Sequence, residues 1–430
     1  LAQASYLIGC QATGEALVVD PNRDIAQYTA TAAAERLRIR YVTETHIHAD
    51  FVSGARALAQ REGAALLLSA EGGPEWQYGF AASSSARLLG DGDAFDVGRL
   101  RIDVLHTPGH TPEHLSFLVT DVPASPHPLM LLSGDFVFVG DVGRPDLLEK
   151  AAKQQNTMEA SARALWRSLA RFRALPDHVQ VWPGHGAGSA CGKALGAVPA
   201  STVGYEKLVN WGVTAPDEAS FVRQVLEGQP EPPAYFARMK RVNKEGPAIL
   251  GELEAPPSVT EERFWQLQRA GAVVLDLRPA ESFARAFIRG AINVPLSGGF
   301  TTYAGSALPF DTPLLFVTPD EGGSSAAEAA RDLALIGFDS IVGRAGPSIV
   351  TRTAAVETIE RVAADAAIER HARGTPIIDV RNSTEWSEQH VRGARHIPFP
   401  ELAERVSEIP RDEPILVQCQ TGARSAIATS

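Results

Sequence analysis

Polar side chains able to bind a cation gather in four short segments in the first half of the chain. Each segment directly follows a predicted strand and contains a glycine or a turn. They are His46–Asp50, Gly109-His110, Gly134-Asp135 and Gly184-His185. In an extended segment, the alternating residues of the first would project to one side. A lone His-x-His is more often an ordinary pair of histidines, but four such segments predict one rim of imidazole and carboxylate ligands around a metal.

A cysteine near the end of the sequence stands in a second reactive context. Cys419 follows the predicted strand 415–417 and precedes a predicted helix, with Arg424 five residues further on. Loop amides at such a junction favour the thiolate, and the arginine adds positive charge. The pattern predicts a nucleophile that accepts sulfur and holds it as a persulfide. The spacing from Cys419 to Arg424 is Cys-x4-Arg, one residue shorter than the Cys-x5-Arg spacing in the phosphate-binding loop of cysteine phosphatases.

The elements that must position these residues alternate short strands with helices. Over about 200 residues this mixture favours an α/β sandwich with polar residues at the strand ends. Strands are expected at 4–8, 15–20, 39–43, 66–68, 100–105, 115–119, 129–132 and 179–181, and helices at 25–38 and 52–62. The segment 246–257 is rich in proline and glycine and is the predicted linker.

The last third of the chain contains an internal repeat. Residues 274–278 match 377–381 at an offset of 103, and residues 289–291 match 392–394 at the same offset. Matched blocks in one order predict two copies of one α/β domain with a parallel sheet. In the first copy Thr318 occupies the position of the cysteine. A threonine cannot carry a persulfide, so we expect this copy to be catalytically inactive.

The histidine and aspartate segments resemble those of the metallo-β-lactamase fold superfamily, whose pattern is His-x-His-x-Asp-His, then Gly-His, Gly-Asp and Gly-His. The resemblance covers about residues 1–245 and implies an αββα sandwich. Phe51 stands where the pattern has its last histidine, which binds the second metal of dinuclear members. Similarity to the mononuclear branch, the persulfide dioxygenases, implies one Fe(II) per chain, bound by His46, His110 and Asp135.

The same resemblance implies groups that surround the ligands and orient them or bind substrate. Those nearest the metal would be His48, Asp50 and His185. Arg144 resembles an arginine of glutathione-persulfide enzymes and would bind a substrate carboxylate, with an ion pair to Asp146 as the equal alternative. Cys191 would carry sulfur or contact substrate, or else be a buried apolar residue. Tyr235 is expected in a pocket lid or in structural packing, and His114 in a structural hydrogen bond.

The cysteine loop and the repeated blocks before it resemble rhodanese sulfurtransferases. We therefore expect a metallo-β-lactamase-like domain at 1–250, an inactive rhodanese-like domain at 258–350 and a rhodanese domain at 355–430. The last domain ends about one helical turn after its loop, so we expect it to be incomplete at its C-terminus.

Composition narrows the setting in which the protein works. A net charge of −11 disfavours nucleic acid and anionic membranes as partners. Three scattered cysteines do not form a disulfide framework, which favours a reducing compartment such as the cytoplasm. No apolar run is long enough to span a membrane. Because the sequence begins with Leu1, the removal of a targeting segment is left open as an alternative. A homo-oligomer is expected from the frequency of oligomers among large enzymes.

Together, the motifs and the two resemblances imply a non-heme Fe(II) persulfide dioxygenase. A low-molecular-weight persulfide, by resemblance glutathione persulfide, would react with O₂ to give sulfite, and Cys419 would make or consume thiosulfate. Two alternatives remain. A glyoxalase II-like thioester hydrolase would need two metals, which Phe51 argues against. A non-enzymatic sulfur carrier or persulfide sensor would use Cys419 alone.

Overall fold

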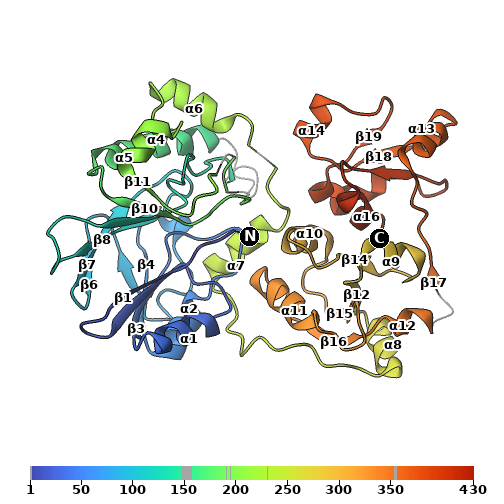
Figure 1. Cartoon of the computed structure of the whole chain (residues 1–430), viewed down its shortest axis with the longest axis horizontal. Helices are drawn as coiled ribbons and strands as arrows, with labels where there is room; N and C mark the ends of the chain where they lie inside the picture. The colour runs from blue at the N-terminus through green and yellow to red at the C-terminus, as the bar shows by residue number, and fades with distance from the viewer. Residues whose placement is uncertain (1, 148–156, 190, 194, 230, 353–355) are drawn as a thin grey trace. The chain divides into compact units, whose positions relative to one another are not determined.

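The computed structural model describes residues 2–147, 157–189, 191–193, 195–229, 231–352 and 356–430 (Figure 1). The chain divides into two compact units. Unit 1 comprises Leu1–Pro232 and Phe236–Glu252, and unit 2 comprises Pro233–Tyr235 and Leu253–Ser430. The main division thus lies inside the predicted linker 246–257. Within the described ranges, no helix has the length and apolar character required to cross a membrane.

Unit 1 contains two sheets. The first has the strand order β1 (Tyr6–Cys10), β2 (Glu15–Val19), β3 (Arg38–Thr43), β4 (Ala65–Ser69), β5 (Arg87–Leu89). The second has the order β11 (Ser201–Thr202), β10 (Gln180–Pro183), β9 (Met130–Gly134), β8 (Leu115–Asp121), β7 (Leu100–His106), β6 (Ala94–Val97). The helices are α1 (Ala26–Ala34), α2 (Ala55–Glu62), η1 (Pro74–Trp76), α4 (Met158–Ala174), α5 (Val203–Val209), α6 (Glu218–Leu226) and α7 (Phe236–Glu245).

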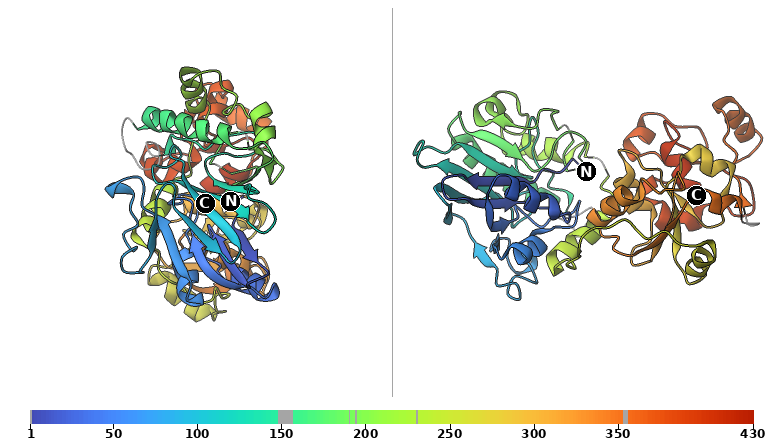
Figure 2. Two further views of the ribbon diagram at one scale, coloured as in Figure 1. Left: turned by 90° about the vertical axis from the view of Figure 1, so that its left-hand side faces the viewer. Right: turned by 60° about the horizontal axis from the view of Figure 1, so that its bottom comes forward.

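Successive side chains of a strand pack on opposite faces of the sheet and so join it to the layers on both sides. On β2, Leu17 and Val19 belong to the apolar core between the two sheets, whereas Val18 packs with residues of α1 and α2. This is the two-residue period of a strand that is buried on both faces. A third apolar cluster joins the second sheet to α4 and α6. Figures 1 and 2 show the strands of this unit between its helices. The predicted αββα sandwich is therefore confirmed.

The helices of unit 1 are shorter than the sequence pattern predicted. The helix expected over 25–38 ends at Ala34, because Arg36 adopts a positive φ of 58° before β3 begins. The helix expected over 52–62 begins only at Ala55. The residues before Ala55 belong to the loop that carries the first histidine segment, so its irregular backbone displaces the helix start.

Unit 2 contains two sheets with the same internal order. The first is β14 (Ile292–Asn293), β12 (Val273–Asp276), β15 (Leu314–Val317), β16 (Ile341–Ala345), and the second is β19 (Arg395–His396), β18 (Ile377–Asp379), β20 (Leu416–Gln418). All neighbours in both sheets are parallel. A short antiparallel pair joins β13 (Phe287–Ile288) to β17 (Val356–Glu357). The helices are α8 (Glu261–Arg269), α9 (Ala280–Arg285), α10 (Phe300–Ala307), α11 (Ala326–Leu335), α12 (Ser348–Thr351), α13 (Ala364–Ala372), α14 (Ser383–Glu388), η2 (Phe399–Glu401), α15 (Leu402–Arg405), η3 (Val406–Glu408) and α16 (Ala423–Ala428).

The internal repeat reappears in the side-chain contacts. In the first copy the guanidinium of Arg278 pairs with Asp276 at 2.6 Å and donates to the carbonyl of Ala286 at 2.8 Å. In the second copy Arg381 makes the same two contacts, at 2.7 Å each, with residues 103 positions further along. Both copies therefore fold alike after their central strand. Their expected boundaries, 258–350 and 355–430, stay a prediction because unit 2 holds both without division.

Helix α10 of the first copy packs against the second copy. It contacts α16, η2 and α15. The ring of Tyr303 on α10 lies edge-on to that of Phe399, with 5.7 Å between centroids. The cysteine-less copy thus supplies part of the surroundings of its neighbour.

Candidate metal and sulfur-transfer sites

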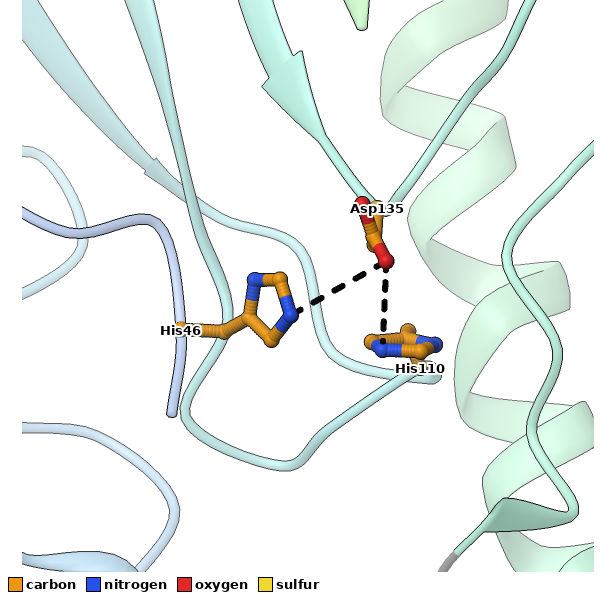
Figure 3. A group of neighbouring side chains, drawn as sticks. All are labelled: His46, His110 and Asp135. Carbon is orange, nitrogen blue, oxygen red and sulfur yellow. Dashed lines mark ion pairs between the residues drawn. The ribbon is translucent and has the colours of Figure 1, made fainter. Parts of the chain in front are cut away.

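Three of the predicted ligands converge at one end of the sandwich. The Nε2 atoms of His46 and His110 lie 3.9 and 3.5 Å from Oδ2 of Asp135, and all three side chains are buried. Figure 3 shows both imidazoles directed at this carboxylate oxygen. Among the described groups, that oxygen has no hydrogen-bond partner. A buried, unpartnered carboxylate oxygen facing two imidazole nitrogens fits a bound metal ion.

The outward-facing nitrogen of each histidine is anchored by a neighbour. Oγ1 of Thr45 lies 2.9 Å from Nδ1 of His46, and Nδ1 of His110 donates to the carbonyl of Arg144 at 3.0 Å. These contacts leave Nε2 of each ring directed at Asp135. Such anchoring of the second ring nitrogen fixes the orientation of a metal-binding histidine.

Burial sets the charge states that metal binding requires. It lowers the pKa of His46 well below its ordinary value and also lowers the pKa of His110, which keeps both rings neutral. Burial alone would raise the pKa of Asp135, but the adjacent His185 outweighs it and holds that pKa well below its ordinary value. The three groups are therefore in the states that bind a cation.

The first histidine segment bends after β3, and its side chains have different polar partners. His46 faces Asp135, whereas Nε2 of His48 lies 3.0 Å from Oδ1 of Asp20. Oδ2 of Asp50 lies 2.8 Å from Nε2 of His185. Burial opposes the charge of His48, but Asp20 dominates and raises its pKa to about 9. The ring of His48 therefore lies beside that of His46, with 4.2 Å between centroids, but its Nε2 is engaged by Asp20.

A second buried group adjoins the first. Ligand atoms of Asp50, His185 and Cys191 all lie within 4.8 Å of one another. Nδ1 of His185 is also 2.7 Å from Oδ1 of Asp135. Burial, with Asp135 and Asp50 nearby, raises the pKa of the Cys191 thiol well above its ordinary value. The structure therefore places Cys191 beside the candidate metal site as a protonated thiol.

The glycines of the Gly-Asp and Gly-His segments allow the backbones to approach closely. A Cβ on Gly184 would lie 2.6 Å from Oδ1 of Asp135. Gly134 has a positive φ of 52°, and a Cβ there would lie 2.7 Å from Nε2 of His114. That nitrogen of His114 accepts the amide of Asp135 at 3.0 Å, which is the structural hydrogen bond expected for this histidine.

Arg144 and Tyr235 have structural partners. The Nε and Nη2 atoms of the buried Arg144 donate to Asp146 at 2.8 and 2.7 Å, which is the alternative ion pair considered from the sequence. Its carbonyl holds His110, as described above. Tyr235 belongs to unit 2, where its ring packs directly against Gly305 of α10. This contact is the structural packing that the sequence left open, and a role in a pocket lid stays a prediction.

Sequence reasoning missed three residues that hold the histidine loop. Asp20 accepts hydrogen bonds from the amide and hydroxyl of Thr45 at 2.6 and 2.8 Å. Asp20 is a polar residue at the end of an apolar run. The same pattern identified the other candidate ligands, so it could have identified Asp20. Glu113 accepts the amide of Ile47 at 2.8 Å. The side chain of Asn243 donates to the carbonyls of His48 and Phe51. No sequence pattern predicts these contacts, because Asn243 is far from the loop in sequence.

The backbone amides of the cysteine loop in the second copy point at the sulfur of Cys419. Sγ of Cys419 lies 3.2 Å from the amide of Gly422 and 3.4 Å from that of Ser425. Burial raises the pKa of this thiol, but the hydroxyl and amide of Ser425 and the amide of Gly422 outweigh it and leave the pKa below its ordinary value. Arg424 is paired with Glu385 through two contacts of 2.6 and 2.7 Å. The loop therefore favours a thiolate.

The side chains of the corresponding loop in the first copy form hydrogen bonds with nearby backbone. The hydroxyl of the buried Thr318 donates to the carbonyls of Asp320 and Ala345 at 2.8 and 3.1 Å. The carboxylate of Glu321 accepts the amide of Ser348 at 2.9 Å. No thiol is present there, and two carboxylates stand where an anion would bind.

Comparisons with known proteins agree with this architecture. Residues 1–185 match the family described as Metallo-beta-lactamase superfamily, and residues 260–344 and 363–430 match the Rhodanese-like domain. The chain is similar to a crystal structure described as a metallo-beta-lactamase from Staphylococcus aureus. The two are 41% identical with a TM-score of 0.73, over 80% of this chain and 96% of that one.

Two kinds of curated enzyme resemble the first part of the chain. The mitochondrial persulfide dioxygenase of Bos taurus is 28% identical over 42% of this chain and 63% of its own length. The hydroxyacylglutathione hydrolase of Rhodospirillum rubrum is 30% identical over 42% of this chain and 60% of its own length. The chain spans about 60% of the length of several of the curated relatives that it matches.

Proposed function

Because the chain belongs to the metallo-β-lactamase superfamily and continues into rhodanese-like domains, we propose that it oxidises a low-molecular-weight persulfide and transfers sulfane sulfur. The proposed substrates are glutathione persulfide and O₂, and the metal is one Fe(II) per chain. The scarce cysteines, all free, favour a reducing compartment such as the cytoplasm.

The observation that carries this proposal is the set of three converging ligands. Two neutral imidazoles and one carboxylate form the arrangement typical of mononuclear Fe(II) oxygenases, which leaves positions open for substrate and O₂. His46, His110 and Asp135 supply these groups, while His48 is held by Asp20. Phe51 packs against the ring of His48, with 4.4 Å between centroids, and offers no ligand atom.

The chemistry that the bound metal supplies is the activation of O₂ beside the persulfide. In the balanced reaction, one persulfide, one O₂ and one water give one thiol, one sulfite and two protons. The four electrons lost by the terminal sulfur reduce O₂. Around the metal, Thr45 and the carbonyl of Arg144 keep the histidines oriented, and His185 orients Asp135.

Cys419 performs the proposed sulfur transfer. As a thiolate it attacks the outer sulfur of a persulfide, releases the thiol and becomes a persulfide itself. Sulfite then attacks that outer sulfur, which yields thiosulfate and restores the thiolate. The amides of Gly422 and Ser425 stabilise the negative sulfur in both states. The reverse reaction would consume thiosulfate.

The test is O₂ uptake by Fe(II)-loaded protein supplied with glutathione persulfide, with sulfite and thiosulfate assayed together. We expect rapid uptake, and a loss of at least about a hundredfold in His110→Ala because a ligand is removed. His127→Ala, at an exposed histidine of the same unit, is the matched control and should retain full activity. Absence of uptake by protein that holds one iron per chain would overturn the dioxygenase proposal.

A second candidate is hydrolysis of a glutathione thioester. It is favoured by the resemblance to hydroxyacylglutathione hydrolases and by the second buried group, Asp50, His185 and Cys191. A dinuclear hydrolase would bind two metals and release a thiol without O₂. Metal stoichiometry and thiol release under anaerobic conditions separate this candidate from the dioxygenase.

A further inference from the structure

We infer that Asn243 is a positioning residue of the metal site, supplied by a helix outside the superfamily match. Helix α7 (Phe236–Glu245) lies beyond residues 1–185, yet it contacts the loop that carries His46 and Asp50. The inference rests on the metal site of the proposed function but not on its reaction.

The side chain of Asn243 makes three hydrogen bonds to one short stretch of backbone. Nδ2 donates to the carbonyl of His48 at 2.8 Å and to that of Phe51 at 2.7 Å. Oδ1 accepts the amide of Ser53 at 2.9 Å. The side chain is 1% exposed, so water does not replace these contacts. One amide group therefore closes the turn between His48 and Ser53.

This stretch of backbone needs an external partner because it forms no helix and no strand ladder. Between Glu44 and Ser53 the described backbone makes an isolated bridge, at Ser53 with Asn22, and the carbonyl of Thr45 accepts the amide of Leu115 at 2.7 Å. Neither contact involves the carbonyls of His48 and Phe51. Buried carbonyls without partners are unfavourable, so the Asn243 contacts select this path of the chain. That path directs His46 toward Asp135 and Asp50 toward His185.

A second side chain of α7 acts on the preceding half of the loop. The ammonium group of Lys240 lies over the ring of Trp76, 3.6 Å from its centroid, and is attracted by the carboxylate of Glu113. Glu113 in turn accepts the amide of Ile47 at 2.8 Å. Helix α7 therefore stabilises the loop on both sides of His48.

The decisive variant is Asn243→Asp. It keeps the size of the side chain and the acceptor for Ser53, but it removes both donor hydrogens. The carbonyls of His48 and Phe51 then lose their partner. We expect the affinity for Co(II), titrated against a chromophoric chelator, to fall by about tenfold or more. The visible spectrum of the bound Co(II) should also change, because the ligands are displaced.

The matched control is Asn293→Asp in unit 2. Nδ2 of the fully buried Asn293 also donates to two carbonyls, those of Asp276 and Arg278, at 2.8 and 2.9 Å. This control loses the same number of hydrogen bonds, and its Co(II) affinity and spectrum should remain unchanged. If Asn243→Asp does not fold, Lys240→Met is the second variant, with a smaller loss of affinity expected.

Three results can be told apart. Loss of Co(II) affinity in the α7 variants alone supports the inference, even if the wild-type protein consumes no O₂ and the proposed reaction fails. Affinity within about twofold of the wild type in folded Asn243→Asp, with the same spectrum, overturns it. Equal losses in Asn243→Asp and Asn293→Asp also overturn it, because they indicate general destabilisation.

Discussion

The sulfur of Cys419 lies close to two backbone amides and the hydroxyl of Ser425, and these groups lower the pKa of the thiol. Because its pKa is lowered, Cys419 loses its proton and becomes a thiolate at a lower pH than an ordinary cysteine does. We expect alkylation of Cys419 by iodoacetamide to titrate below the range of a free thiol. Ser425→Ala should move the titration upward by about one pH unit, because a hydrogen bond to a charged group contributes about 1.5 kcal/mol.

Cys191 provides an internal comparison in the same experiment. Burial, Asp135 and Asp50 raise the pKa of its thiol, so it should remain unmodified over the pH range in which Cys419 reacts. Peptide mass spectrometry after timed alkylation distinguishes the two sites. Equal rates at Cys191 and Cys419 would contradict the assigned charge states.

At the level of the elements, the backbone directly after β10 is packed closely against the candidate metal site at one position, Gly184. Gly184→Ala would place a methyl group 2.6 Å from Oδ1 of Asp135. We expect the carboxylate to be displaced and the metal affinity to fall by about tenfold or more. Gly186→Ala, two residues on, meets no atom within 4 Å and should bind metal like the wild type. Metal content after dialysis against a weak chelator measures both.

The strands and the converging ligands could be predicted because their signals are local. Apolar runs such as 39–43 and 129–132 correspond to β3 and β9, and a polar residue after each run marked His46 and Asp135. Strand ends in a layered α/β fold bring such residues together. The repeat could also be predicted, since the aspartate and arginine at 276 and 278 recur 103 residues later. In the structure each arginine pairs with its aspartate.

The directions of the side chains in the histidine loop could not be predicted. The alternation of His46, His48 and Asp50 suggested an extended segment, but tertiary hydrogen bonds decide the path of this loop. Asp20 and Asn243, which hold it, come from 28 residues before and 195 residues after His48. No local pattern encodes a contact between elements so far apart in sequence.

At the level of the whole molecule, the two units have separate apolar cores, and among the described residues the candidate metal ligands all belong to unit 1. A ligand that binds only the folded state stabilises that unit, by about 2.7 kcal/mol when its free concentration is about a hundredfold above its Kd. We therefore expect a chelator to lower the thermal transition of unit 1 and leave that of unit 2 in place. Calorimetry with and without chelator measures this, and an equal shift of both transitions would contradict it.

The packing of α10 against α16 also bears on how such a chain can evolve. After a duplication, a copy that loses its reactive residue can usually be deleted, because selection no longer maintains it. Here the copy with Thr318 still covers part of the copy with Cys419 through α10, including the contact of Tyr303 with Phe399. Deletion would expose that apolar surface. A copy without a thiol can therefore still be required for the structure of its neighbour.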